Sequence, residues 1–203
     1  GVLATLPSLG VQCLALPPPH HTEHGAALCA ALFLHHELQQ DLLSHVLAAL
    51  FAGGSTADAA AFVFRVFRRQ HHERFLAGIE KFGLSKAPHA VAAAQYHYLS
   101  NQIGGVNVEY MRESDRKAWI RYPPPRWIWK GTAICGIPGE VSRAMLRGWH
   151  ANNGVALGDL RLGFVCTKQS VDGQDGLEGY YCEYDHPLEL DQRLVFARHL
   201  EAP

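Results

Sequence analysis

The amino-acid sequence predicts an α+β fold, in which an N-terminal helical layer packs on a small, mainly antiparallel sheet with a crossover helix. Three features of the sequence support this class. Residues 23–102 contain three successive segments with helical character. Residues 107–122 and 162–184 each contain two short strand-like segments separated by a turn. One further helical segment separates these pairs, an order typical of α+β domains.

The helices are expected over residues 23–51, 57–82 and 88–102, and from Pro138 to about Gly154. Ser55 or Thr56 can cap the second helix, and Asp58 is favourable in its first turn. The third and fourth helices each open on a proline, which is tolerated in the first helical turn. Glycines are expected to end the helices, at Gly53-Gly54, Gly83, Gly104-Gly105 and near Gly154.

The strands are expected over residues 107–113, 117–122, 162–169 and 177–184. Glycine and aspartate between the last two favour a turn. Residues 190–200 suit either a short helix or an edge strand. Trp119 and Phe164 lie in the middle of apolar strand segments, so both are expected to pack against the helical layer.

The chain is expected to divide into an irregular arm (residues 1–24), a helical part (25–105) and an α+β part (106–203). Triple proline at residues 17–19 favours an extended arm. The two later parts are expected to share one core, since a small sheet with one apolar face needs a cover.

The composition excludes some partners. The 18 basic and 19 acidic residues give a net charge of −1, so the chain lacks the basic excess typical of nucleic-acid binding. No apolar run is long enough to cross a bilayer, so no membrane partner is expected. The five cysteines form no paired framework, which predicts reduced thiols, no structural disulfide and a cytoplasmic location. A small-molecule ligand is the expected partner, and a homo-oligomer is compatible with the sequence.

Candidate catalytic residues lie around the second strand pair. Cys166 lies in the strand that follows the crossover helix, His150 lies towards the end of that helix, and Asp159 lies between them in the sequence. A thiolate beside an imidazole is a nucleophile, and a carboxylate can orient that imidazole. The alternative is that Cys166 is a buried packing residue.

A second group of residues suggests a substrate pocket. Arg121 can hold a carboxylate through paired hydrogen bonds, and aromatic side chains nearby can form the walls. The candidate substrate-binding residues are Arg121, Tyr122, Arg126, Trp127 and, on the third helix, Tyr96, His97 and Asn101. The alternative is an exposed arginine pair beside tryptophans of the core.

No cofactor is required by these patterns, but three histidines leave a metal site open. His35, His71 and His97 each lie on a mainly apolar face of a different predicted helix. Three imidazoles that converge in a bundle could hold zinc or iron. The alternative is that they are buried histidines with hydrogen-bonded rings.

The second strand pair also carries a family resemblance. Cys166, Gly173, Gly176 and the segment YYCEY at residues 180–184 stand in the order strand with cysteine, glycine turn, strand with cysteine and aromatic residues. This layout, over about residues 88–185, resembles the ligand-binding domain of four-vinyl-reductase-like proteins and haem–nitric-oxide sensors, and the ending resembles that of bacterial aminothiazoline-carboxylate hydrolases. The resemblance implies a ligand pocket between helices and sheet.

The function predicted from these residues is hydrolysis of a C–N bond in a small polar metabolite that bears a carboxylate. Cys166 and His150 would act as nucleophile and base, with Arg121 on the substrate carboxylate. Two alternatives remain open at this point: a non-catalytic module that binds a small ligand or a partner protein, and a metalloprotein that uses the helix histidines.

Overall fold

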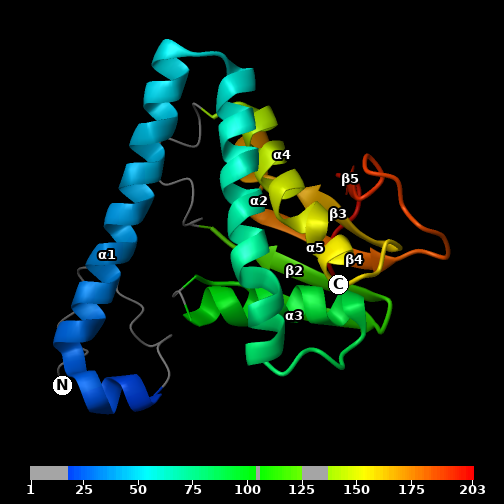
Figure 1. The fold of residues 1–203 in the computed structure, drawn as a ribbon, viewed down its shortest axis with the longest axis horizontal. Helices are drawn as coiled ribbons and strands as arrows, with labels where there is room; N and C mark the ends of the chain where they lie inside the picture. The colour runs from blue at the N-terminus through cyan, green and yellow to red at the C-terminus, as the bar shows by residue number, and fades with distance from the viewer. Residues whose placement is uncertain (1–17, 104–105, 125–136) are drawn as a thin grey trace.

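The computed structural model describes residues 18–103, 106–124 and 137–203 (Figure 1). Its helices are α1 (Pro18–Gly53), α2 (Thr56–Lys81), α3 (His89–Ile103), α4 (Gly139–Gly148) and the single turn α5 (Asn153–Ala156). Its strands are β1 (Glu109–Ser114), β2 (Lys117–Tyr122), β3 (Leu162–Lys168), β4 (Leu177–Glu183) and β5 (Leu194–Phe196). Short 3₁₀ turns span His150–Asn152 and Ser170–Asp172.

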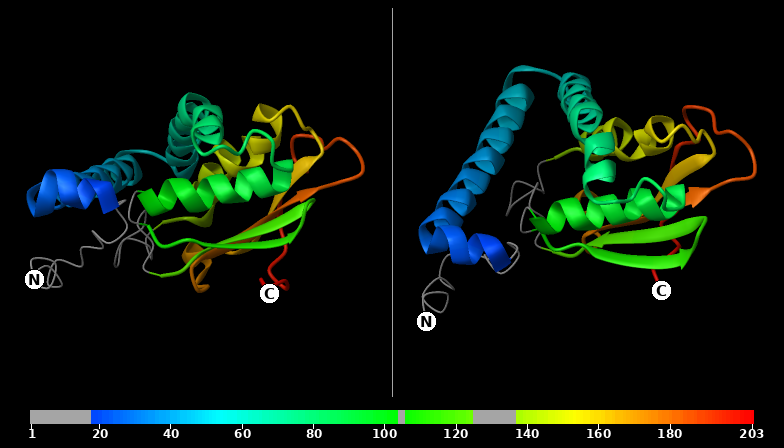
Figure 2. Two further views of the ribbon diagram at one scale, coloured as in Figure 1. Left: turned by 90° about the horizontal axis from the view of Figure 1, so that it is seen from below. Right: turned by 60° about the horizontal axis from the view of Figure 1, so that its bottom comes forward.

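The five strands form one sheet in the order β1-β2-β4-β3-β5. All neighbouring strands are antiparallel except β5, which pairs in parallel with β3. The tail therefore forms an edge strand rather than a helix. Helices α2, α3 and α4 lie on one side of the sheet (Figure 2), and α3 contacts β1, β2 and β4. The predicted α+β class is confirmed.

Local sequence signals explain where the helices begin. At the start of α2 the backbone N–H of Asp58 donates to Ser55 Oγ (3.2 Å), and the N–H of Ser55 donates to Asp58 Oδ2 (3.1 Å). This reciprocal capping box satisfies two N–H groups that have no partner inside the helix. The helix α1 begins earlier than expected, at Pro18, so residues 18–24 are helical and not an irregular arm. A kink at Gly25 (φ 64°) interrupts it.

The core forms where α2 crosses α4 above the sheet. Six buried residues of α2 follow one another at four-residue intervals: Ala59, Val63, Phe67, His71, Phe75 and Ile79. Such a row forms one ridge of a helix surface and can pack into the groove of a neighbour. Gly148 at the end of α4 lets the two backbones approach, because a Cβ there would lie 2.9 Å from Phe64 O. His71 is the polar member of this otherwise apolar row.

The two faces of the sheet differ. Phe164 is fully buried on the helix-facing side, 4.7 Å from the His150 ring, as predicted. Trp119 is also buried, but its alternation with Ile120 and Tyr122 places it on the opposite side. There its ring lies 4.5 Å from the Tyr180 ring. The prediction that Trp119 packs against the helical layer is therefore wrong, because strand alternation separates it from that layer.

Candidate functional site

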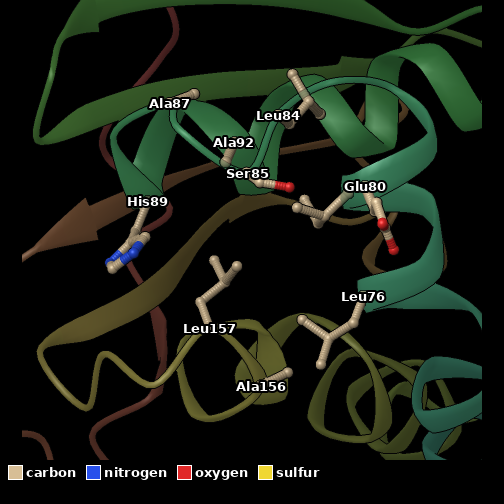
Figure 3. Close-up of a pocket in the computed structure, with 10 residues that line it drawn as sticks. Leu76, Glu80, Leu84, Ser85, Ala87, His89, Ala92, Ala156 and Leu157 are labelled. Atoms are coloured by element: carbon tan, nitrogen blue, oxygen red, sulfur yellow. The ribbon is translucent and has the colours of Figure 1, made fainter.

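A pocket of about 350 Å³ opens between the end of α2, the α2–α3 connection, the start of α3 and α5 (Figure 3). Its apolar lining includes Leu76, Ile79, Leu84, Ala92 and Leu157. Glu80, Ser85 and His89 supply its polar groups. A volume of this size lies within the range of small-molecule sites, which are mainly apolar with a few placed polar groups.

His89 at the edge of the pocket is paired with a buried carboxylate. Its Nδ1 lies 2.9 Å from Oδ2 of Asp159, whose side chain is 5% exposed. The backbone N–H and Nε of Arg161 donate to the other oxygen of Asp159, at 3.0 and 3.2 Å. Burial alone would raise the pKa of Asp159, but the hydrogen bonds from His89 and Arg161 outweigh burial and lower it. Asp159 is therefore an anion at neutral pH.

The charge on Asp159 decides the tautomer of His89. An ionised carboxylate only accepts hydrogen bonds, so His89 Nδ1 must carry a hydrogen and donate it. In the neutral ring the lone pair is then on Nε2. His89 can thus accept a hydrogen bond, or a proton, from a bound molecule.

Local structure brings these two residues together. His89 is the first residue of α3, directly after Pro88. Gly158 takes a left-handed conformation (φ 73°) after α5, and the N–H of Asp159 then donates to Gly154 O (2.9 Å). This turn holds Asp159 against the start of α3. The contact joins segments 70 residues apart in the chain.

Glu80 is the only aspartate, glutamate, lysine or arginine among the described residues that line the pocket. Figure 3 shows Glu80 and His89 on opposite sides of the hollow, with Leu157 between them. No lysine or arginine is among the described residues that line the pocket. A ligand with a positive charge or N–H donors suits this lining better than an anion does.

Behind the pocket, a chain of hydrogen bonds crosses the core from α2 to the sheet. His71 Nε2 donates to Asn153 Oδ1 (2.9 Å), and Asn153 Nδ2 faces His97 Nε2 at 3.3 Å. His97 Nδ1 in turn donates to the Tyr122 hydroxyl (2.9 Å). Asn153 Nδ2 also donates to the Tyr181 hydroxyl (2.8 Å). The single side chain of Asn153 thus links two helices to two strands.

His71 and His97, the two histidines of this hydrogen-bond network, are neutral. Burial lowers the pKa of His71 to about 4 and that of His97 to about 3. The hydrogen bond from His71 to Asn153 opposes this shift without cancelling it. Each ring has one donor and one acceptor nitrogen matched to its neighbours, since Asn152 Nδ2 lies 3.2 Å from His71 Nδ1. The network is satisfied as it stands and is closed to solvent.

Of the three predicted catalytic residues, Asp159 has its two carboxylate oxygens engaged by His89 and Arg161. The buried His150 ring stacks on that of His97 (4.4 Å) and contacts Phe164, which lies on the same face of β3 as Cys166. Cys166 is 1% exposed, and its thiol donates to Lys168 O (3.4 Å). Burial of Cys166 leaves no direct route for a substrate to its sulfur.

Of the predicted substrate-binding residues, the structure brings three together. His97 Nδ1 and Asn101 Nδ2 both donate to the Tyr122 hydroxyl, at 2.9 and 3.5 Å, where α3 crosses β2. Tyr96 is buried on the side of α3 that faces α2, with its ring 4.9 Å from that of Phe75. None of these four residues lines a described pocket. Arg126 and Trp127 lie outside the described residues.

Arg121 is separated from this group because it lies on the far face of the sheet. Its Nε donates to the fully buried Glu178 (2.7 Å), and its Nη1 donates to Glu109 (3.0 Å). Thr167 Oγ1 donates to Glu178 as well (2.8 Å). Arg121 therefore does bind carboxylates, but they belong to its own sheet.

The predicted trio of metal-binding histidines does not assemble. His35 is exposed on α1, beside Gln39, while His71 and His97 are buried and joined through Asn153. Within the described ranges, no group of three or more histidine, cysteine, aspartate or glutamate side chains is placed to hold a metal ion such as zinc or iron. The alternative metal site is thus unsupported.

Sequence reasoning missed His89 and Glu80. The one local signal for His89 is its place directly after the helix-starting Pro88, where a polar side chain projects from a helix end. Glu80 carries no signal, because a glutamate in the last turn of a helix is usually a solvated residue. Only their position around the same hollow distinguishes them.

No protein-family model, curated protein or solved structure matches this chain. Cys166 and Cys182 are both free thiols, and the other three cysteines lie outside the described side chains. No helix in the described ranges combines the length and the apolar character needed to cross a membrane.

Proposed function

We propose that the protein binds a small organic amine, with an apolar body and a protonated nitrogen, in the pocket between α2, α3 and α5. The observation that carries this proposal is the pairing of His89 with the buried Asp159 at the edge of a pocket in which polar groups lie among leucine, isoleucine and alanine side chains. His89 Nε2 is an acceptor for an N–H group, and Glu80 across the pocket offers a carboxylate to a cation. The leucine and alanine side chains between them suit the apolar body.

The same chemistry argues against the carboxylate-bearing ligand predicted from sequence. An anion in this pocket would lie near the carboxylate of Glu80, with no lysine or arginine among the described lining residues to balance it. Repulsion between like charges disfavours such binding. Arg121, which was expected to hold the substrate carboxylate, is instead engaged by Glu178 and Glu109.

The proposal is tested by titrating isotope-labelled protein with matched pairs of small amines and carboxylates of the same carbon skeleton. Amines are expected to shift the amide resonances of Leu84 and Leu157 at lower concentration than their carboxylate partners. Glu80→Gln should weaken amine binding roughly fivefold, since a partly exposed ion pair contributes up to about 1 kcal/mol. His89→Ala should weaken it as well, while His72→Ala, an exposed histidine on the same helix as Glu80, serves as the control. Equal binding of both classes, or of neither, would contradict the proposal.

A second candidate, hydrolysis of a C–N bond, is favoured by the tautomer of His89. With Nδ1–H held by Asp159, Nε2 can take a proton from water while the hydroxide adds to the carbon of the C–N bond. The same proton, returned from Nε2 to the leaving nitrogen, completes the cleavage. Water replaces the cysteine nucleophile in this scheme.

A turnover screen with small amides and amidines separates the two candidates. For a hydrolase, Asp159→Asn should lower kcat by about a hundredfold or more, because the ring loses its fixed tautomer. Cys166→Ala should leave turnover unchanged, whereas loss of turnover in that variant would restore the cysteine mechanism. If amines bind but no compound is turned over, hydrolysis is rejected and the binding function is retained.

A further inference from the structure

The helix α1 carries an apolar stripe that the rest of the described chain leaves uncovered. Leu34, Leu38 and Leu42 are 58%, 58% and 65% exposed. They are spaced four residues apart and so lie along one ridge of the helix. Figures 1 and 2 show that α1 stands away from the other helices and the sheet along most of its length and approaches α2 near their junction. There Leu47 is buried in the core.

The sides of the stripe carry groups of opposite character. His35 precedes Leu38 by three residues and Asp41 follows it by three. Since a helix turns about 100° per residue, the two side chains lie about 60° to either side of Leu38. Both are exposed. The leucine stripe therefore has a histidine on one flank and a carboxylate on the other.

This arrangement is complementary to itself. When two identical stripes face each other and run in the same direction, the histidine flank of each lies over the aspartate flank of the other. A histidine ring can donate a hydrogen bond to a carboxylate, and a charged ring strengthens the pair. Stripes that run in opposite directions would instead place aspartate against aspartate. The flanks thus select both the partner and the orientation.

We propose that a second copy of this chain covers the stripe of Leu34, Leu38 and Leu42, with the two α1 helices crossing at Leu38. Rows of residues at four-residue spacing are inclined to the helix axis, so two helices whose rows run parallel cross at about −50°. The twofold axis then runs along the stripe, and each leucine meets the same leucine of the partner. His35 of each copy lies beside the partner's Asp41.

The mass of the protein in solution tests whether the dimer exists. Sedimentation velocity over a wide concentration range is expected to show a species of twice the monomer mass of 22.4 kDa. Leu38→Glu should remove this species, because it places two carboxylates side by side at the twofold axis. The control is Leu190→Glu, which alters a leucine that is 75% exposed in the chain segment between β4 and β5. Circular dichroism confirms that both variants remain folded.

Cross-linking and charge exchange test the geometry. Oxidised Leu38→Cys protein should form a covalent dimer whose position-38 peptides are joined, while Leu32→Cys, exposed on another side of α1, should not. His35→Asp should weaken the dimer, and His35→Asp combined with Asp41→His should restore it, because the exchange keeps opposite flanks complementary. A protein that stays monomeric at every concentration would overturn the proposal, whatever else covers the stripe. A dimer whose stability is unchanged by Leu38→Glu and by the charge exchange would also overturn the proposal.

Discussion

His71 lies in the row through which α2 contacts the core, and Asn152 and Asn153 fix which of its ring nitrogens carries the hydrogen. Asn153 and Tyr122 likewise fix which ring nitrogen of His97 carries the hydrogen. A buried polar group without a partner costs more than its hydrogen bond contributes. These histidines are tolerated in the core because each ring nitrogen has a matched neighbour.

Asn153 is the residue on which this network depends. Asn153→Ala removes the partner of His71 Nε2, of His97 Nε2 and of the Tyr181 hydroxyl at once. We expect the free energy of unfolding to fall by about 3 kcal/mol or more, since each buried group left without a partner costs about 1–3 kcal/mol. Urea unfolding measures it, with the exposed Asn107→Ala as control. A loss no larger than in the control would mean that water replaces the amide.

The thiol of Cys166 should be unreactive in the folded protein, because it is buried and donates to a backbone carbonyl. We expect iodoacetamide to modify Cys166 only after unfolding. Mass spectrometry of peptides from native and urea-treated protein gives the comparison. Cys182, which is half-buried, is the internal reference, although burial raises the pKa of its thiol as well. Rapid native modification of Cys166 would favour the nucleophilic role predicted from sequence.

Between elements, α2 and α4 approach each other closely. At Gly148 an added Cβ would lie 2.9 Å from Phe64 O and 3.0 Å from Phe67 Cβ. The guanidinium of Arg68 then donates to the carbonyls of Gly148 (2.9 Å) and Arg147 (2.8 Å) at the end of α4. These bonds satisfy carbonyls that lack a partner inside the helix.

Gly148→Ala should therefore push the two helices apart. We expect a loss of about 1–3 kcal/mol in the free energy of unfolding, the usual cost of an extra methyl group in a packed core. The matched control is Gly53→Ala at the end of α1, where an added Cβ has no neighbour within 4 Å. Thermal unfolding of both variants provides the test. Equal stability of the two would show that α2 and α4 can adjust their contact.

At the scale of the whole molecule, the buried histidines make folding depend on pH. The pKa of His71 is about 4 and that of His97 about 3 in the folded protein, against 6.5 in an unfolded chain. Between these values the unfolded chain binds protons that the folded chain does not. The contribution of these two histidines to the free energy of unfolding is therefore complete above pH 6.5. It falls as the pH decreases towards 4.

We expect each histidine to contribute a slope of up to about 1.4 kcal/mol per pH unit in this window. Urea unfolding at a series of pH values from neutral to mildly acidic measures the slope. His71→Gln should reduce it, whereas the neighbouring exposed residue in His72→Gln should not. A His71→Gln variant with the parental slope would show that folding does not lower the pKa of His71.

The sequence by itself determined the α+β class and most of its elements. The strand predicted over residues 117–122 is β2, and those over 162–169 and 177–184 are β3 and β4 to within a residue. The capping residues at the start of α2 and the proline before α3 also predicted where these helices begin. Turn chemistry, capping and alternation act between near neighbours in the chain, so they are written locally.

Only the tertiary structure decided which side chains meet. Strand alternation places Arg121 and Tyr122 on opposite faces of the sheet but does not say which of them faces the helices. In the folded protein Tyr122 faces the helices and bonds to His97, while Arg121 on the other face bonds to Glu178. The partner of Asp159 is His89, 70 residues away, and not the nearer His150. The pocket, the histidine network and the uncovered stripe of α1 all arise from such long-range placement. It depends on how the whole set of ridges and strand registers fits together, which no local pattern of residues encodes.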